Sequence, residues 1–264
     1  MSHWYTNLGE NRYDSGLREA RENNYLPSVT TIDKVIGNPG LEIWKNQQVL
    51  LSSLTMTRGE DESDKDFVSR VMTDSRQQAR KAAQLGNVIH KLAERYIMGK
   101  PLFYHGPRKD VWIISDQVKI WIDEHLEVPD SGFINDEGAE RVLVNQKYGY
   151  AGKADFYGRI KPNIPVIIDW KTTFIKQSDV KKNGELKKAK YYPSWLRQLA
   201  ALRACDNHVP ACYSVVISTN PDIPGVWSRK WSEDELAKGW KEFKAALILW
   251  KSINNYESGN DEET

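Results

Sequence analysis

Apolar residues recur every three or four positions in several stretches of the chain, which is the spacing of one face of an α-helix. The clearest stripes are Val111, Ile114, Val118, Trp121, Ile122 and Leu126, and then Leu236, Trp240, Phe243, Leu247 and Trp250. Ser232 and Glu235 precede the second stripe with the spacing of a capping box, which marks a helix start. We therefore expect two amphipathic helices with their apolar faces on a core.

Weaker helical patterns cover residues 41–54, 66–98 and 194–206, the second with an interruption near Thr73. A short helix near residue 30 would take Thr30 or Thr31 as its N-cap. Residues 1–25 are polar without a clear period, so we expect a loosely ordered lead-in there. The acidic run 58–66 predicts a solvated loop between two helices.

Alternation of apolar and polar residues predicts strands in the second half of the chain. The runs 140–147 and 153–160 flank the glycine-rich segment 148–152, which is typical of a hairpin turn. A third run, 166–173, would complete a three-stranded antiparallel meander. Residues 211–219 and 226–231 predict two more strands.

The third run ends in a polar sequence that carries the chemistry. On a strand, Val166, Ile168 and Trp170 would point into a core, while Asp169 and Lys171 share the opposite side. Adjacent antiparallel strands lie about 5 Å apart, so Asp155 could sit beside Asp169.

Two carboxylates this close repel each other unless a cation lies between them, and carboxylate oxygens are natural ligands of Mg²⁺ and Mn²⁺. The pattern therefore favours a divalent metal site with a lysine beside it. The alternative is a solvated strand end with a local ion pair.

A histidine on the predicted helix 66–98 is the candidate third ligand. Gly86, His90 and Ala93 share a helix face, and Glu94 lies one turn beyond His90. Glu94 could hydrogen-bond His90 or a water molecule at the metal. The alternative is a core histidine with satisfied hydrogen bonds.

Composition narrows the class of protein. The 264 residues carry a net charge of +1, so a polyanionic partner must be held by local patches. The absence of a long apolar run excludes a transmembrane helix, and the first residues lack the features of a signal peptide. Cys205 and Cys212 are too few for a disulfide scaffold, a Cys₄ zinc site or an iron–sulfur cluster. A soluble, intracellular and cytoplasmic protein is expected.

A basic patch is predicted at residues 174–192, which hold six lysines and end in Tyr191 and Tyr192. One interpretation is a solvated hairpin. The other is a flap in which lysines such as Lys187 and Lys188 contact phosphates and the aromatic rings stack on bases.

The order of these polar residues resembles that of a known nuclease superfamily. In sequence order they are Gly86-x₃-His90-x₃-Glu94, Glu140, Gly152-Lys153-Ala154-Asp155, Ile168-Asp169-Trp170-Lys171-Thr172-Thr173 and Gln198. This order resembles the PD-(D/E)xK superfamily, in particular its RecB-like branch, which includes the mitochondrial genome maintenance exonuclease and related phage exonucleases. The resemblance covers about residues 80–205. A weaker similarity begins at Pro27-Ser28-Val29.

The resemblance implies roles for individual residues. It assigns catalysis to Lys171, Asp169, Asp155 and Glu140, and Mg²⁺ or Mn²⁺ ligation to His90, Asp155, Asp169 and the Trp170 carbonyl. Glu94, one turn from His90, is a further catalytic candidate. Gln198 matches the glutamine of a Q-x-x-x-Y motif, but Leu202 stands where the tyrosine is expected. We expect nucleic-acid contacts from Thr172, Thr173, Gln198, Arg197, Tyr191, Tyr192, Lys187, Lys188 and Ser28.

The predicted fold class is α/β, with a central mixed β-sheet flanked by helices, as in a restriction-endonuclease-like core, and a helical N-terminal region. We expect a helical extension at 1–75 with a candidate arch at 41–80, a nuclease core at 76–252 and an acidic disordered tail at 253–264.

The predicted function is a metal-dependent DNA exonuclease that prefers single-stranded DNA or free ends. Replication or recombination proteins are the expected partners, and no membrane is involved. A structure-specific endonuclease and a non-catalytic nucleic-acid-binding subunit remain as alternatives.

Overall fold

The protein divides into two units according to its internal contacts. The computed structural model describes residues 3–37, 39–100, 109–129, 137–206, 208 and 210–258. Unit 1 consists of Met1–Ile36 together with Ile89–Thr264, and unit 2 of Gly37–Val88.

A five-stranded sheet forms the centre of unit 1. Its strands are β4 (Gly138–Asn145), β5 (Tyr150–Ile160), β6 (Ile164–Thr173), β7 (Ala211–Ser218) and β8 (Val226–Lys230), and they lie in that order. β6 and β7 run parallel, whereas the other neighbours are antiparallel. The predicted meander and the mixed sheet are thus confirmed.

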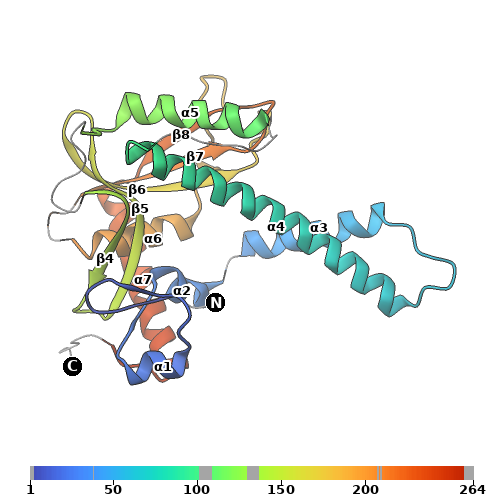
Figure 1. Cartoon of the computed structure of the whole chain (residues 1–264), viewed down its shortest axis with the longest axis horizontal. Coiled ribbons are helices and arrows are strands. Elements are labelled where there is room, and N and C mark those ends of the chain that lie inside the picture. The colour runs from blue at the N-terminus through green and yellow to red at the C-terminus, as the bar shows by residue number, and fades with distance from the viewer. Residues whose placement is uncertain are drawn as a thin grey trace. The chain divides into compact units, whose positions relative to one another are not determined.

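Helices cover both faces of this sheet, as Figure 1 shows, with α5 (Lys109–His125) on one side and α6 (Pro193–Arg203) and α7 (Glu233–Asn254) on the other. Ile167 of the central strand packs in one core with Leu199 of α6 and Phe243 of α7. Trp170 contacts Trp121 of α5 with ring centroids 5.3 Å apart. β6 is therefore buried on both faces, and the predicted α/β class with flanking helices is confirmed.

The N-terminal segment is ordered, contrary to the expected loose lead-in. It forms a small sheet from β1 (Trp4–Tyr5), β2 (Asn11–Arg12) and β3 (Leu26–Pro27), together with α1 (Leu17–Glu22) and α2 (Val29–Asp33). Trp4 is 1 % exposed because its ring packs against Trp250 and Tyr256 near the C-terminus. The apolar partners come from distant sequence, so local polarity did not reveal them.

Unit 2 contains α3 (Pro39–Thr55) and most of α4 (Asp64–Ile97), which continues from Ile89 into unit 1. The expected interruption near Thr73 is wrong, since α4 is continuous there. In the loop between α3 and α4, the Glu62 carboxylate accepts hydrogen bonds of 2.6 and 2.7 Å from Arg70 of α4. The acidic loop is therefore anchored by ion pairs. The arch at 41–80 and the boundaries at 75 and 252 stay predictions.

The basic segment 174–192 connects β6 to α6 and is ordered. Val180 pairs with Leu186, and Leu186 packs with Ile175, which is 0 % exposed. The turn at Gly184 is left-handed, with φ +84°, which suits glycine. Of the predicted tail, residues 259–264 lie outside the described residues. In the part of the chain that the structure describes, no helix is long and apolar enough to cross a membrane.

Candidate active site

The candidate site lies where β5 and β6 separate. Their hydrogen-bonded register ends at the pair Phe156 and Ile168, so Asp155 and Asp169 lie one position beyond it. The prediction that these two carboxylates are neighbours is confirmed at the level of strand register. Asp155 also lies at an interruption on its other side, because the ladder to β4 skips Glu140.

Asp155 is held by one strand and one helix. Its Oδ2 accepts a 2.7 Å hydrogen bond from the backbone N–H of Trp170, and its Oδ1 lies 3.6 Å from Nδ1 of His90 on α4. Burial raises the pKa of Asp155, but His90 and Lys171 outweigh that effect, so the pKa lies below its usual value. Burial likewise lowers the pKa of His90, and Asp155 more than reverses this shift.

Asp169 lies in a different environment. Its side chain is 3 % exposed, and its Oδ2 is 2.6 Å from Nζ of Lys171. That contact lacks hydrogen-bond geometry, so Oδ2 is a buried oxygen without a hydrogen bond among the described residues. Burial raises the pKa of Asp169 to about 6, and nearby Asp155 adds to this rise, although Lys171 opposes it.

Lys171 connects the strand end to α6. Its Nζ donates a 3.0 Å hydrogen bond to Oε1 of Gln198 and lies 5.9 Å from the ring centroid of Trp195. Gln198 therefore faces the strand end. Trp195 precedes Gln198 by three residues on α6, which is the spacing of helix neighbours. That spacing is the sequence signal that relates Trp195 to Gln198.

Glu140 is placed beside the site by unusual backbone geometry. It has φ +60°, a left-handed conformation that is uncommon for residues with a side chain. Its carboxylate forms an ion pair with Lys153, a residue that received no role from the sequence. Burial lowers the pKa of Lys153, but Glu140 outweighs this and raises it overall.

Three predicted site residues have other partners. Arg197 is 6 % exposed and binds Asp33 with hydrogen bonds of 2.5 and 3.2 Å, so it cannot contact a nucleic acid from this position. Ser28 is 3 % exposed and caps α2 by accepting a hydrogen bond from Thr31 N–H, which also replaces the predicted cap. Glu94 accepts from Lys91 Nζ at 2.6 and 2.9 Å.

The other predicted contacts have side chains that are at least partly exposed. Thr172 and Thr173 continue β6 and are partly exposed. Lys187 is exposed, and Lys188 Nζ lies 3.8 Å from Glu235. Tyr191 and Tyr192 end the basic segment directly before α6.

A divalent metal ion needs several oxygen or nitrogen donors around one point. In the described part of the chain, no three His, Cys, Asp or Glu side chains are arranged to hold a metal as they stand. Asp169 faces Lys171 and Asp155 faces His90 instead. The donor types nevertheless suit Mg²⁺ or Mn²⁺, and the buried Asp169 oxygen without a hydrogen bond is the kind of atom that a cation would satisfy. The residues are therefore of the right chemical types to hold Mg²⁺ or Mn²⁺, provided that the Asp169–Lys171 and Asp155–His90 contacts rearrange.

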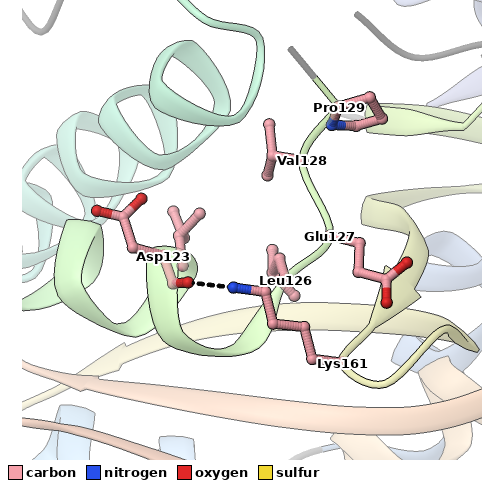
Figure 2. Close-up of a pocket in the computed structure, with 7 residues that line it drawn as sticks. Asp123, Leu126, Glu127, Val128, Pro129 and Lys161 are labelled. Carbon is pink, nitrogen blue, oxygen red and sulfur yellow. Dashed lines mark hydrogen bonds between the residues drawn. The ribbon is translucent and has the colours of Figure 1, made fainter.

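A hollow of about 490 Å³ lies elsewhere, at the end of α5. Figure 2 shows its lining, in which Lys161 Nζ donates to the backbone oxygen of Asp123 at 2.5 Å. Leu126, Glu127, Val128 and Pro129 also line it, and none of the predicted site residues does.

The architecture and the site define an α/β protein with acidic and basic groups at the end of a central strand. No family model and no curated protein matches the chain. One similar solved structure is a candidate exonuclease from Eubacterium rectale, at 14 % identity and a TM-score of 0.41, over 69 % of this chain and 71 % of that one.

Proposed function

We propose that the protein is a metal-dependent deoxyribonuclease that hydrolyses phosphodiester bonds as an exonuclease, on single-stranded DNA or free ends. One observation carries this proposal: Asp155, Asp169 and Lys171 converge at the end of β6, with His90 and Gln198 contacting them. Two carboxylates and an imidazole can hold a metal ion, and an amine beside them can stabilise charge on the phosphate. These are the groups that metal-dependent phosphodiester hydrolysis requires.

The proposed metal is Mg²⁺ or Mn²⁺, held by Asp155, Asp169 and His90, with the Trp170 carbonyl as a further ligand. When bound, it would neutralise charge on the phosphate and lower the pKa of water. Competition from His90 and Lys171 for the carboxylates predicts that metal affinity depends on pH.

The chain's own residues would supply orientation and charge. Lys171 is placed by Gln198 and can donate to a phosphoryl oxygen as negative charge develops there. Thr172 and Thr173, at the partly exposed end of the same strand, can donate to neighbouring phosphates. Glu140 and Glu94 lie in ion pairs with Lys153 and Lys91, where they would act by positioning those lysines.

The test compares cleavage of end-labelled single strands, linear duplexes and closed circles with Mg²⁺, Mn²⁺ or EDTA. Release of mononucleotides or short oligomers from ends supports the proposal. Cleavage of closed circles identifies an endonuclease instead, and retarded but intact DNA identifies a binding subunit.

Variants connect activity to the site. Lys171→Ala and Asp169→Ala should abolish cleavage. Asp169→Ala should melt near the wild-type temperature or above it, whereas Lys171→Ala should melt lower, because it leaves the buried Asp169 carboxylate without its cation. Arg18→Ala is the control, since Arg18 also forms an ion pair, at 3.0 Å with Glu22, on an exposed surface outside the basic segment. Full activity in either site variant would falsify the assignment.

A further inference from the structure

The two tyrosines at the end of the basic segment differ in their surroundings. Tyr191 packs against Leu186 and Val216 in a small core, and the Arg229 guanidinium lies 5.5 Å from its ring centroid. Tyr192 is 39 % exposed. Tyr191 thus supports the segment from inside, and Tyr192 offers its ring to the surface.

Tyr192 is connected to the candidate catalytic lysine through one ring. Its ring meets that of Trp195 edge to face, with centroids 4.8 Å apart at 85°. Lys171 Nζ lies 5.9 Å from the same Trp195 ring. Tyr192, Trp195 and Lys171 therefore form a continuous row that leads from the surface to the strand end.

The backbone at Tyr192 is restricted as well. Tyr192 is the N-cap of α6, with φ −83° and ψ 146°, and Pro193 follows at the first helical position. A residue before proline is confined to extended conformations. The ring is therefore presented from a fixed backbone, and little conformational entropy is lost when a ligand packs on it.

We infer that Tyr192 is a stacking platform for one unpaired base, next to the phosphate that Lys171 contacts, with Trp195 as its support. This inference rests on the proposed function and deepens it by assigning a base-binding position next to the candidate catalytic lysine. A base can lie on a tyrosine ring only when it has left the duplex stack, and stacking tolerates every base because each has a π-face.

Binding without cleavage tests the inference. Fluorescence anisotropy in EDTA would compare a labelled single-stranded oligodeoxynucleotide with a fully abasic strand of equal length, which keeps the phosphates and lacks the bases. Tyr192→Ala should weaken binding of the normal strand about tenfold, since stacking on one aromatic ring has an effect of this order. Tyr192→Phe should bind within about twofold of wild type because it keeps the ring.

The abasic strand provides the internal control, because wild type and Tyr192→Ala should bind it equally. Trp112→Ala removes another exposed ring, 46 % exposed on α5, and should leave both affinities unchanged. Equal binding of the normal strand by wild type and Tyr192→Ala would overturn the inference. So would an equal loss on both strands, which would indicate a general distortion.

The outcomes separate this inference from the proposed function. Binding that depends on Tyr192, in a protein that cleaves nothing with Mg²⁺ or Mn²⁺, supports the platform and refutes hydrolysis. If the protein cleaves DNA and Tyr192→Ala binds as tightly as wild type, hydrolysis is supported and the platform is refuted. A wild-type protein that binds neither strand overturns both.

Discussion

Asp155 and Asp169 are identical side chains that the fold places in different electrostatic environments. Asp155 accepts from a backbone N–H and faces His90, which lowers its pKa. Burial raises the pKa of Asp169, and the neighbouring Asp155 adds to this rise. Opposite shifts in neighbouring acids are common where a site is built for a charge that arrives later.

The raised pKa of Asp169 predicts that Asp169→Asn stabilises the metal-free protein at pH 7. An acid whose pKa rises on folding, here from 3.8 to about 6, contributes stability below pH 3.8 that is lost as pH increases through 6. The neutral amide avoids this loss, which amounts to at most about 3 kcal/mol. Thermal melting in EDTA at pH 4 to 8 would measure it. A lower melting temperature at pH 7 would contradict the assigned environment.

Asp206→Asn is the matched control, and the opposite sign is expected. Burial raises the pKa of Asp206, but hydrogen bonds from Tyr157 at 2.6 Å and from His208 outweigh it, so the pKa is lowered. Its contribution is present above pH 3.8 and is lost as pH falls through the folded-state pKa. The amide should therefore destabilise the protein at pH 7 by about 1 to 3 kcal/mol. In acid, where both native carboxyl groups are protonated, the stability of each variant should approach that of wild type.

At the scale of elements, α6 connects the site to the rest of the fold. One side of this helix presents Gln198 to Lys171. Another side carries Arg197, which pairs with Asp33 of α2 and lies 3.5 Å from Glu242 of α7. α6 is thereby held between α2 and α7, and its remaining side contacts Lys171, the candidate catalytic residue.

The buried ion pair of α6 predicts a large stability effect. Arg197→Ala should cost about 3 to 5 kcal/mol, because Asp33 and Glu242 lose their buried partner. Chemical denaturation would measure the change. Arg18→Ala breaks an exposed pair with Glu22 and should cost less than about 1 kcal/mol. A loss of DNA affinity at unchanged stability would instead restore Arg197 as a nucleic-acid contact.

Close packing of α6 on the sheet gives a second prediction at this scale. A Cβ at Gly152 of β5 would lie 2.7 Å from side-chain atoms of Leu202 and Val29. Gly152→Ala should therefore destabilise the fold by about 1 to 3 kcal/mol. At Gly16, φ is −86° and nothing lies within 4 Å of the position that a Cβ would take, so Gly16→Ala should have a small effect in the same denaturation experiment. Equal effects would contradict this packing.

At the scale of the whole molecule, the two ends of unit 1 share one core. Trp4 of β1 contacts Trp250 of α7 and Tyr256 beyond it, with centroids 5.8 and 5.3 Å apart. The Tyr256 hydroxyl donates to the Ala20 carbonyl at 3.0 Å. The segment before the sheet is therefore part of the globular unit.

This shared core predicts that Trp4→Ala costs about 3 to 5 kcal/mol, the usual effect of truncating a buried aromatic residue. Leu8→Ala should change stability by less than about 0.5 kcal/mol, since Leu8 is 87 % exposed. Urea denaturation of both variants provides the measurement. A small loss for Trp4→Ala would show that the N-terminal strands are not needed for the core.

Local patterns in the sequence were enough to predict most elements and the order of the polar residues. Helical stripes, the capping box at Ser232 and the alternation in three strands extend over a few residues each, and local backbone preferences encode them. The register of β5 and β6 places Asp155 beside Asp169, and the short connections of the meander make that register predictable from the sequence.

Packing between distant segments established which of these residues face the site and with what charge. Arg197 meets Asp33 across 164 positions, so no local pattern revealed that it is buried. Burial likewise separates Tyr192 from Tyr191. Burial raises the pKa of both Asp155 and Asp169, but contacts with His90 lower that of Asp155, although the two acids read alike in sequence. Exposure and pKa depend on every chain segment that packs nearby, and the sequence specifies these segments only through the complete fold.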